Sequence, residues 1–202
     1  MTMARWPHTG AILAGGQSRR MGRPKEGVIL PDGNPMIARV IAALQAVCRQ
    51  VVVVGACRGF EIPAGMLHLP DLHPGEGPLA GIESLLAGKL DDRYLVAGCD
   101  QPLLTPKLLC RLTRCHAEGV CLFCTDDARD FFPFPGIYPV GLLPLVQEAL
   151  RSGQRSMKRL LERVEVTRVI LSAEDASLLR SINMPEDLAA LPPAGASRLK
   201  FG

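Results

Sequence analysis

Aromatic side chains are scarce in this sequence: they make up 4% of its 202 residues, whereas hydrophobic residues as a whole make up 48%. The apolar content comes mostly from Leu, Ala and Val, so we predict an aliphatic core of the kind found in parallel sheets covered by helices. So much apolar material excludes a disordered chain. The length suffices for one well-filled domain and is short for two.

Strong charge and long apolar runs are also missing. The formal net charge is only +3 and the basic residues are scattered, which excludes a dedicated nucleic-acid binder but allows a local basic pocket. No uninterrupted apolar stretch reaches the ~18 residues of a membrane span. Residues 1–10 lack the charged and apolar regions of a signal peptide. We therefore expect a cytoplasmic protein with no nucleic-acid or membrane partner.

The sequence also lacks the arrangements typical of nucleophilic catalysis and of histidine-based metal sites. Neither a Ser-His-Asp nor a Cys-His arrangement is visible. The four histidines show no spacing typical of metal ligands: His8, His68, His73 and His116.

Seven cysteines are present, and four of them are close in sequence. Cys121 and Cys124 form a C-x-x-C pair, so a zinc or redox site is one interpretation. However, Cys110 and Cys115 are five residues apart on a predicted helix, which places them on diverging faces. In a predicted strand over 120–125 the C-x-x-C thiols point to opposite faces. We therefore predict reduced thiols that pack as small hydrophobes.

Strand and helix patterns alternate along the chain. The apolar runs predict strands at residues 9–13, 51–54, 66–69, 94–97, 120–125 and 164–170. Helical spacing predicts helices at residues 35–48, 78–87, 105–112, 140–151, 157–162 and 185–191. This order predicts a single-domain, Rossmann-like three-layer α/β/α fold with a mostly parallel sheet and right-handed crossovers. The domain spans residues 1–202, with flexible tails at 1–8 and 192–202.

The most informative segment is the glycine-rich run L-A-G-G-Q-S-R-R-M-G-R-P-K, residues 13–25, directly after the first predicted strand. Gly15 and Gly16 allow backbone N–H groups to approach phosphate oxygens. Arg20 and Lys25 add fixed positive charge suited to a triphosphate. The segment is neither a Walker loop nor a G-x-G-x-x-G motif. An ordinary glycine-rich turn with solvated arginines is the alternative interpretation.

Two further segments follow the pattern of a nucleotide site. Asp100 comes after the predicted strand 94–97, at the ligand side of a parallel sheet, where a carboxylate can hold Mg²⁺ between phosphates. The alternative is that Asp100 caps a turn before Pro102. Residues 77–81, G-P-L-A-G, open a helix with small side chains whose backbone groups suit a flat base edge. Plain packing of that helix on the sheet is the alternative.

These motifs together resemble a known family. Four segments occur in the family's order, and the resemblance spans residues 10–188. The first is L-A-G-G-x-S-x-R-M-G-x-x-K, and the second is Asp71 followed by G-P-L-A-G-I. The third is D-Q-P, and the fourth is I-N-M-P-E-D-L. The sequence is similar to the molybdenum cofactor guanylyltransferases and their nucleotidyltransferase relatives. The resemblance implies a fold of the nucleotide-diphospho-sugar transferase type.

The resemblance also implies roles for individual residues. It implies catalytic roles for Arg20, Lys25 and Asp100, with Mg²⁺ held by Asp100. The nucleotide-binding residues that it implies are Leu13, Ala14, Gly15, Gly16, Lys25, Asp71, Gly77, Pro78, Leu79, Ala80, Gly81 and Asp100. The acceptor-binding residues that it implies are Arg155, Lys158 and Asn183.

Simpler interpretations stand beside three of these assignments. Asp71 follows a proline and could form a turn. Arg155 and Lys158 could belong to a charged, solvated helix face. Asn183 could cap the helix that Pro185 opens.

The reaction implied by the resemblance is Mg²⁺-dependent transfer of GMP from GTP to the phosphate of molybdopterin or the molybdenum cofactor, with release of pyrophosphate. A phosphate monoester has a second pKa of about 6, so the acceptor is already anionic and needs no general base. Other proteins of the cofactor pathway are further implied partners.

Three alternatives to this reaction stay open. The first is the same chemistry with CTP or another phosphate acceptor, although cytidylyltransferases are expected to carry L-A-A-G where this chain has L-A-G-G at residues 13–16. The second is a nucleotide-binding protein without catalysis. The third is a zinc or redox protein built on the cysteines.

Two departures from the family pattern concern the acceptor side. Residues 131–135 read F-F-P-F-P, where a simpler polar segment leading to a proline is expected. Met184 replaces a small polar residue. Both changes bear on the identity of the acceptor more than on that of the nucleotide.

Overall fold

The computed structural model describes residues 5–15, 21–22, 24–115, 117–125 and 131–191. Its seven-stranded sheet has the order β3-β2-β1-β4-β6-β5-β7. All neighbours pair in parallel except β6, which is antiparallel to both β4 and β5. The mostly parallel sheet is therefore confirmed. The strands are β1 (Trp6–Leu13), β2 (Cys48–Val54), β3 (Leu67–Leu69), β4 (Arg93–Gly98), β5 (Val120–Cys124), β6 (Phe131–Pro139) and β7 (Val166–Ile170).

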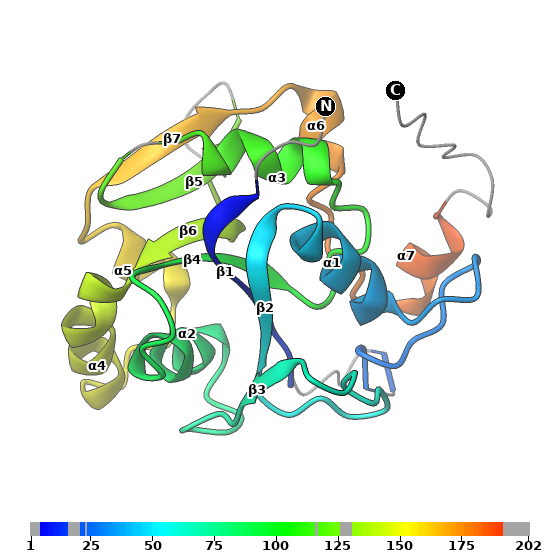
Figure 1. Ribbon diagram of the computed structural model, residues 1–202, viewed down its shortest axis with the longest axis horizontal. Helices are drawn as coiled ribbons and strands as arrows, with labels where there is room; N and C mark the ends of the chain where they lie inside the picture. Colours follow the sequence, from blue (N-terminus) through cyan, green and yellow to red (C-terminus); the bar gives the residue numbers. More distant parts are fainter. Residues whose placement is uncertain (1–4, 16–20, 23, 116, 126–130, 192–202) are drawn as a thin grey trace.

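Helices cover both faces of this sheet (Figure 1). Their bounds are α1 (Met36–Gln45), α2 (Pro78–Ala87), α3 (Pro106–Thr113), the short 3₁₀ helix η1 (Val140–Leu142), α4 (Leu143–Arg151), α5 (Met157–Leu161), α6 (Ala173–Ser177) and α7 (Pro185–Ala189). Helices α1 and α3 pack on one face, and α2, α4 and α5 pack on the other. The predicted three-layer α/β/α architecture is confirmed. Among the described residues, no helix combines the length and the apolar character needed to cross a bilayer.

The core is aliphatic because the strands are buried on both sides. Successive strand residues point to opposite faces, so Val53 and Leu95 pack under α1 and α3, whereas Val52 and Val96 pack under α2 and α4. All four are fully buried. Strands covered on both faces need an apolar residue at every position, which explains the uninterrupted valine run of β2.

Several elements differ from the sequence prediction, among them the short helix α6, which was not predicted. Strand β1 begins at Trp6, whose N–H donates to the carbonyl of Val47 at 2.7 Å, so residues 6–8 of the predicted tail are part of the sheet. Helix α1 ends at Gln45, and Cys48 already belongs to β2. Strand β6 was not predicted, because three prolines interrupt its apolar pattern.

The cysteines are free thiols. Cys48, Cys99, Cys121 and Cys124 are buried, as predicted, and the other three are half-buried. Burial raises the pKa of the Cys48 thiol to about 12. No cluster of three or more His, Cys, Asp or Glu side chains suited to a metal ion occurs among the described residues.

Candidate active site

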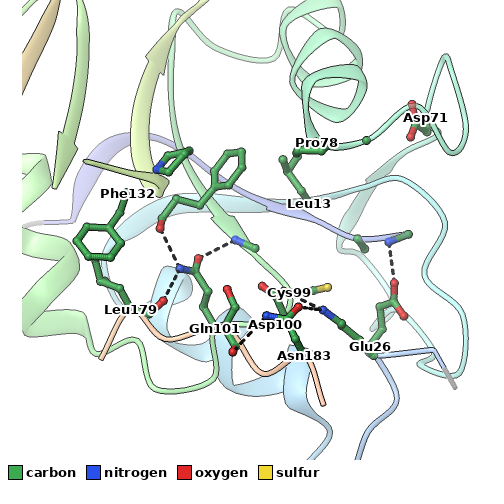
Figure 2. A pocket seen from close by; sticks show the side chains of 18 of the residues that line it. Leu13, Glu26, Asp71, Pro78, Cys99, Asp100, Gln101, Phe132, Leu179 and Asn183 are labelled. Carbon is green, nitrogen blue, oxygen red and sulfur yellow. Dashed lines mark hydrogen bonds and ion pairs between the residues drawn. The ribbon is translucent and has the colours of Figure 1, made fainter. Parts of the chain in front are cut away.

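A cavity of about 670 Å³ opens at the carboxyl ends of β1 and β4 (Figure 2). Open α/β sheets bind their ligands at this edge. The residues that line it are Leu13, Ala14, Gly15, Lys25, Glu26, Asp71, Gly75, Gly77, Pro78, Gly98, Cys99, Asp100, Gln101, Phe132, Pro133, Phe134, Leu179, Ser181 and Asn183. Residues from six separate segments of the chain therefore meet in one site.

The loop after β1 is held against the loop after β2. The N–H of Ala14 donates to the carbonyl of Val54 at 2.8 Å. Gly15 has a φ of +96°, and a Cβ added there would lie 2.8 Å from the backbone nitrogen of Ala56. Gly15 is thus required by packing between the two loops, a reason that the sequence interpretation did not include. Gly16 and Arg20, also assigned to the site, lie outside the described residues.

Gly55 makes the matching close approach from the other loop. A Cβ at Gly55 would lie 2.3 Å from the carbonyl oxygen of Ala14, and its φ is +93°. Gly55→Ala should therefore lower the free energy of unfolding by about 3 kcal/mol, through backbone strain and steric overlap. Gly33→Ala is the matched control, since Gly33 has a φ of +83° and open space around it, and it should cost only about 1 kcal/mol. Urea unfolding measures both, and equal losses would show that the contact with Ala14 is unimportant.

Three polar side chains meet at the centre of the cavity. The Nζ of Lys25 lies 3.1 Å from the Oδ2 of Asp100 and donates to the Oδ1 of Asn183 at 2.5 Å. The Lys25 and Asp100 side chains are 16% and 23% exposed, so both are reachable from the cavity. The Ile182 N–H donates to the Asp100 carbonyl at 2.8 Å and fastens the segment that carries Asn183. The structure thus brings together Lys25, Asp100 and Asn183, three residues to which the family resemblance assigns roles.

Asn183 does not cap the last helix. The N-cap residue of α7 is Met184, and the Oδ2 of Asp187 accepts from the N–H groups of both Asn183 and Met184, at 2.9 and 3.0 Å. The Asn183 side chain is therefore left to face Lys25 in the cavity. The helix-cap interpretation of Asn183 was wrong, because Asp187 supplies the capping carboxylate instead.

Glu26 is a lining residue that the sequence interpretation missed. It is only 2% exposed, and its Oε1 accepts the N–H of Gly15 at 2.7 Å. Its carboxylate therefore fixes the backbone of the glycine loop at Gly15. Its position directly after Lys25 was the only signal in the sequence.

Gln101 connects three segments around the cavity. Its Oε1 accepts the N–H of Gly98 at 3.1 Å, and its Nε2 donates to the carbonyls of Phe134 at 2.9 Å and Leu179 at 3.1 Å. The residue is 3% exposed. Both amide hydrogens are thus used to fix the first half of β6 and the segment before α7 against the end of β4.

Gln101→Glu tests this connection with almost no change in side-chain shape. A carboxylate donates no hydrogen bond, so the carbonyls of Phe134 and Leu179 lose their donor and face a buried negative charge. We expect a loss of about 2–4 kcal/mol in the free energy of unfolding, measured by urea denaturation. The exposed Gln45→Glu should change it by no more than about 0.5 kcal/mol. A loss for Gln101→Glu as small as that of the control would contradict the bridging role.

One end of the cavity contains part of the predicted nucleotide site. Asp71, Gly77 and Pro78 line it together with Leu13. Gly77, with a φ of +86°, is the N-cap of α2. The Oδ1 of Asp71 also accepts the N–H of His73 at 3.0 Å, so the predicted turn is present as well.

The rest of the G-P-L-A-G segment does not line the cavity, and its contact with the nucleotide stays a prediction. Leu79 and Ala80 are fully buried on the sheet, and Gly81 packs against the side chain of Leu13. None of the three lines the cavity. Only Gly77 and Pro78, at the very start of α2, line the cavity, because a helix that packs along the sheet presents just its end to the sheet's edge.

Two predicted acceptor-binding residues lie away from this cavity. Arg155 pairs with Glu76, and its Nη1 donates to the carbonyl of Leu150 at 2.8 Å. It lines a separate depression between α2 and α4, and Lys158 is exposed on α5. These positions favour the interpretation that Arg155 and Lys158 belong to a charged, solvated helix face.

The sequence interpretation also did not include Cys99 and the aromatic residues of β6 in the site. Burial, reinforced by the nearby carboxylates of Asp100 and Glu26, raises the pKa of the Cys99 thiol well above its usual range. Cys99 therefore stays protonated near neutral pH and is no candidate for a thiolate nucleophile. The run F-F-P-F-P, which departs from the family pattern on the acceptor side, supplies Phe132, Pro133 and Phe134 to the cavity.

Comparison with known proteins identifies the family of this chain. A family model described as MobA-like NTP transferase domain matches residues 10–169. A probable molybdenum cofactor guanylyltransferase of Deinococcus radiodurans is 33% identical over 195 residues, covering 96% of this chain and 98% of that protein. A protein of the same name from Pelotomaculum thermopropionicum is 35% identical over 145 residues, covering 71% and 69% of the two chains.

Solved structures show the same fold. The molybdopterin-guanine dinucleotide biosynthesis protein A of Archaeoglobus fulgidus superposes with a TM-score of 0.73 at 25% identity, covering 90% of this chain and 95% of that one. The 2-C-methyl-D-erythritol 4-phosphate cytidylyltransferase of Thermus thermophilus gives 0.64 at 18% identity, covering 89% and 95%, and this likeness concerns the fold alone. The matched family model and the full-length relatives together show that this chain belongs to the MobA-like NTP transferase family, is related to the molybdenum cofactor guanylyltransferases, and is a nucleotidyltransferase.

Proposed function

We propose that this enzyme transfers GMP from GTP to the phosphate of molybdopterin, with Mg²⁺, and releases pyrophosphate. The observation that carries the proposal is the meeting of Lys25 with Asp100 and Asn183 in one cavity, beside the glycine loop. The names of the curated relatives support the guanine nucleotide and the cofactor pathway.

The residues of the cavity suit a reaction between two anions. The acceptor phosphate is already a nucleophile at neutral pH, so the site has to align it with the α-phosphorus and neutralise the leaving charge. The Lys25 ammonium faces the cavity centre and supplies positive charge there. The Oδ1 of Asn183 and the Oδ2 of Asp100 hold that ammonium in place.

The donor set also fits Mg²⁺. This ion prefers oxygen ligands and is usually bound by one or two carboxylates together with substrate phosphates. Asp100 presents a partly exposed carboxylate to the cavity, and it would hold the ion. When bound, Mg²⁺ supplies positive charge that offsets the repulsion between phosphate groups.

Pyrophosphate release tests the proposal. The protein is incubated with Mg²⁺ and molybdopterin, and GTP, CTP, ATP and UTP are offered separately. Release with GTP alone supports both base and acceptor. Release with CTP would contradict the choice of guanine but would still support nucleotidyl transfer. No release with any of the four, while GTP still binds, would contradict molybdopterin as the acceptor, or catalysis itself.

A further inference from the structure

Glu26 is a buried carboxylate in the cavity that we assign to the nucleotide. The residue is only 2% exposed, and yet it belongs to the lining of the cavity. A charge that is removed from water destabilises a protein unless hydrogen bonds compensate for it. The hydrogen bond that Glu26 accepts comes from the backbone N–H of Gly15, at 2.7 Å (Figure 2). The contact indicates a role at the glycine loop rather than in the packing of the core.

This contact fixes the orientation of one peptide group. The Ala14–Gly15 peptide is trans, so its N–H and its carbonyl point in opposite directions. The N–H is held by Glu26, and the carbonyl oxygen of Ala14 lies against Gly55, where an added Cβ would come within 2.3 Å of it. Both sides of the peptide are thus fixed, which sets the direction in which the chain continues from Gly15 into the glycine loop.

The same hydrogen bond bears on which backbone groups can serve a phosphate. The N–H of Gly15 is engaged by a carboxylate oxygen, so in this arrangement it does not donate to a phosphate oxygen. A phosphate at this N–H would also lie beside the negative charge of Glu26, which is unfavourable. Glu26 is therefore better placed to orient the loop than to share its donor with the nucleotide.

The segment that carries Glu26 is held in place by its neighbours. Val28 is fully buried, and its N–H donates to the carbonyl of Lys25 at 3.1 Å. Gly27 packs on the loop after β2, since an added Cβ there would lie 2.1 Å from the carbonyl oxygen of Gly59. Lys25 and Glu26 are therefore fixed on one short segment.

The two adjacent side chains connect two parts of the cavity. The Lys25 ammonium lies 3.1 Å from Asp100 at the end of β4, whereas Glu26 reaches Gly15 after β1. A shift of one side chain through the shared backbone would move the other. The glycine loop and the lysine have to stay in register, because both have to meet the same chain of phosphate groups.

We propose that Glu26 is a positioning residue for the nucleotide, which orients the Gly15 peptide and keeps the glycine loop in register with the Lys25 ammonium. The property that matters for this role is an acceptor atom that reaches the Gly15 N–H, more than the charge of the side chain. The inference rests on the proposed function, in that a nucleoside triphosphate binds in this cavity.

Two substitutions at Glu26 separate reach from charge. Glu26→Gln keeps an oxygen that can accept the Gly15 N–H, whereas Glu26→Asp keeps the charge on a side chain that is one methylene shorter. Binding of a fluorescent GTP analogue is measured without turnover. Glu26→Asp should raise its Kd at least tenfold, and Glu26→Gln should keep the Kd within about threefold of the original value. Glu118→Ala, at an exposed carboxylate that does not line the cavity, is the control and should leave the Kd unchanged.

Three results would overturn the proposal. An unchanged Kd in Glu26→Asp would show that the contact does not matter for the nucleotide. An equal loss in both variants would show that reach is not the decisive property. Tighter binding in Glu26→Gln would show that the carboxylate competes with a phosphate. If urea unfolding shows that Glu26→Asp is not folded, Glu26→Gln still decides, because tighter binding or a tenfold loss in that variant contradicts the role.

Hydrogen exchange of the Gly15 amide, followed by NMR, checks the contact without any nucleotide. Exchange should be at least tenfold faster in Glu26→Asp than in the unchanged protein, and Glu26→Gln should restore most of the protection. Equal exchange rates in all three proteins would contradict the contact from which the proposal starts.

A double-mutant cycle with Lys25→Ala tests the register between the two side chains. If Glu26 acts through that register, the factor by which Glu26→Asp raises the Kd should be at least three times smaller in the Lys25→Ala background than in the unchanged protein. Independent effects that simply multiply would overturn the coupling.

The unchanged protein distinguishes failure of this role from failure of the proposed function. Binding of a CTP analogue in place of the GTP analogue, or binding of GTP without reaction with molybdopterin, would refute the proposed function alone, and the Glu26 variants are then compared with the nucleotide that binds. Reaction of GTP with equal binding to all variants would refute the positioning role alone. No binding of any nucleoside triphosphate would overturn both.

Discussion

Lys25→Ala should lower kcat for nucleotidyl transfer by about two to three orders of magnitude, as expected when a preorganised positive charge is removed from the leaving group. Lys25 is the cation that the structure places at the centre of the cavity, 3.1 Å from Asp100. Its side chain is partly exposed, so the free energy of unfolding should change by no more than about 1 kcal/mol.

The control for Lys25 is a lysine outside the site. Lys107→Ala removes the same charge from the exposed surface of α3 and should leave kcat within about twofold of the original value. Steady-state pyrophosphate release measures both variants, and urea unfolding checks that they are folded. Unchanged turnover in Lys25→Ala would remove Lys25 from the mechanism.

Asp100→Asn should reduce kcat/KM by roughly 10²–10³-fold, because the variant loses the carboxylate that we assign to Mg²⁺ but keeps the side-chain shape. The hydrogen bond from Ile182 to the backbone carbonyl of Asp100 remains available, so the fold is preserved. The expected loss of kcat/KM therefore results from removing the negative charge of Asp100 and not from a change in the structure of the site.

A thermal-shift measurement tests the same residue without turnover. A ligand that binds only the folded state raises Tm, and at a fixed concentration it raises Tm more when its Kd is lower. GTP with Mg²⁺ should therefore stabilise the unchanged protein more than GTP alone. Asp100→Asn should abolish the Mg²⁺-dependent part of the shift. Asp92→Asn, at an exposed carboxylate outside the cavity, should keep it. A full Mg²⁺-dependent shift in Asp100→Asn would place the ion elsewhere.

Local patterns in the sequence account for most of the sheet and its helices. The valines of β2 predict a strand because each of them is buried on one face or the other. Helix α2 has the predicted bounds, since Pro78 opens it after Gly77. Thr105, the first residue of the helix predicted at 105–112, caps α3, and its side chain accepts the N–H of Leu108 at 3.2 Å. These features depend on contacts between residues a few positions apart.

Strand β6 could not be predicted in the same way. Its prolines weaken the pattern of a strand, and its place between β4 and β5 depends on pairing with both neighbours. The register pairs Tyr94 with Tyr138 and Cys121 with Ile137, contacts that no short window of sequence contains. The antiparallel insertion brings Phe132 and Phe134 to the edge of the cavity.

The sequence by itself determined the kind of site: a glycine loop after the first strand, a lysine at its end, and a carboxylate after another strand. Only the tertiary structure decided which residues share the cavity. Lys25 and Asn183 are separated by 158 positions, and the three bonds of Gln101 reach backbone in distant segments. The family resemblance implied Arg155 and Leu79 as site residues, yet neither lines the cavity. Charge and residue size describe what a side chain can bind, whereas the packing of helices on the sheet determines what it faces.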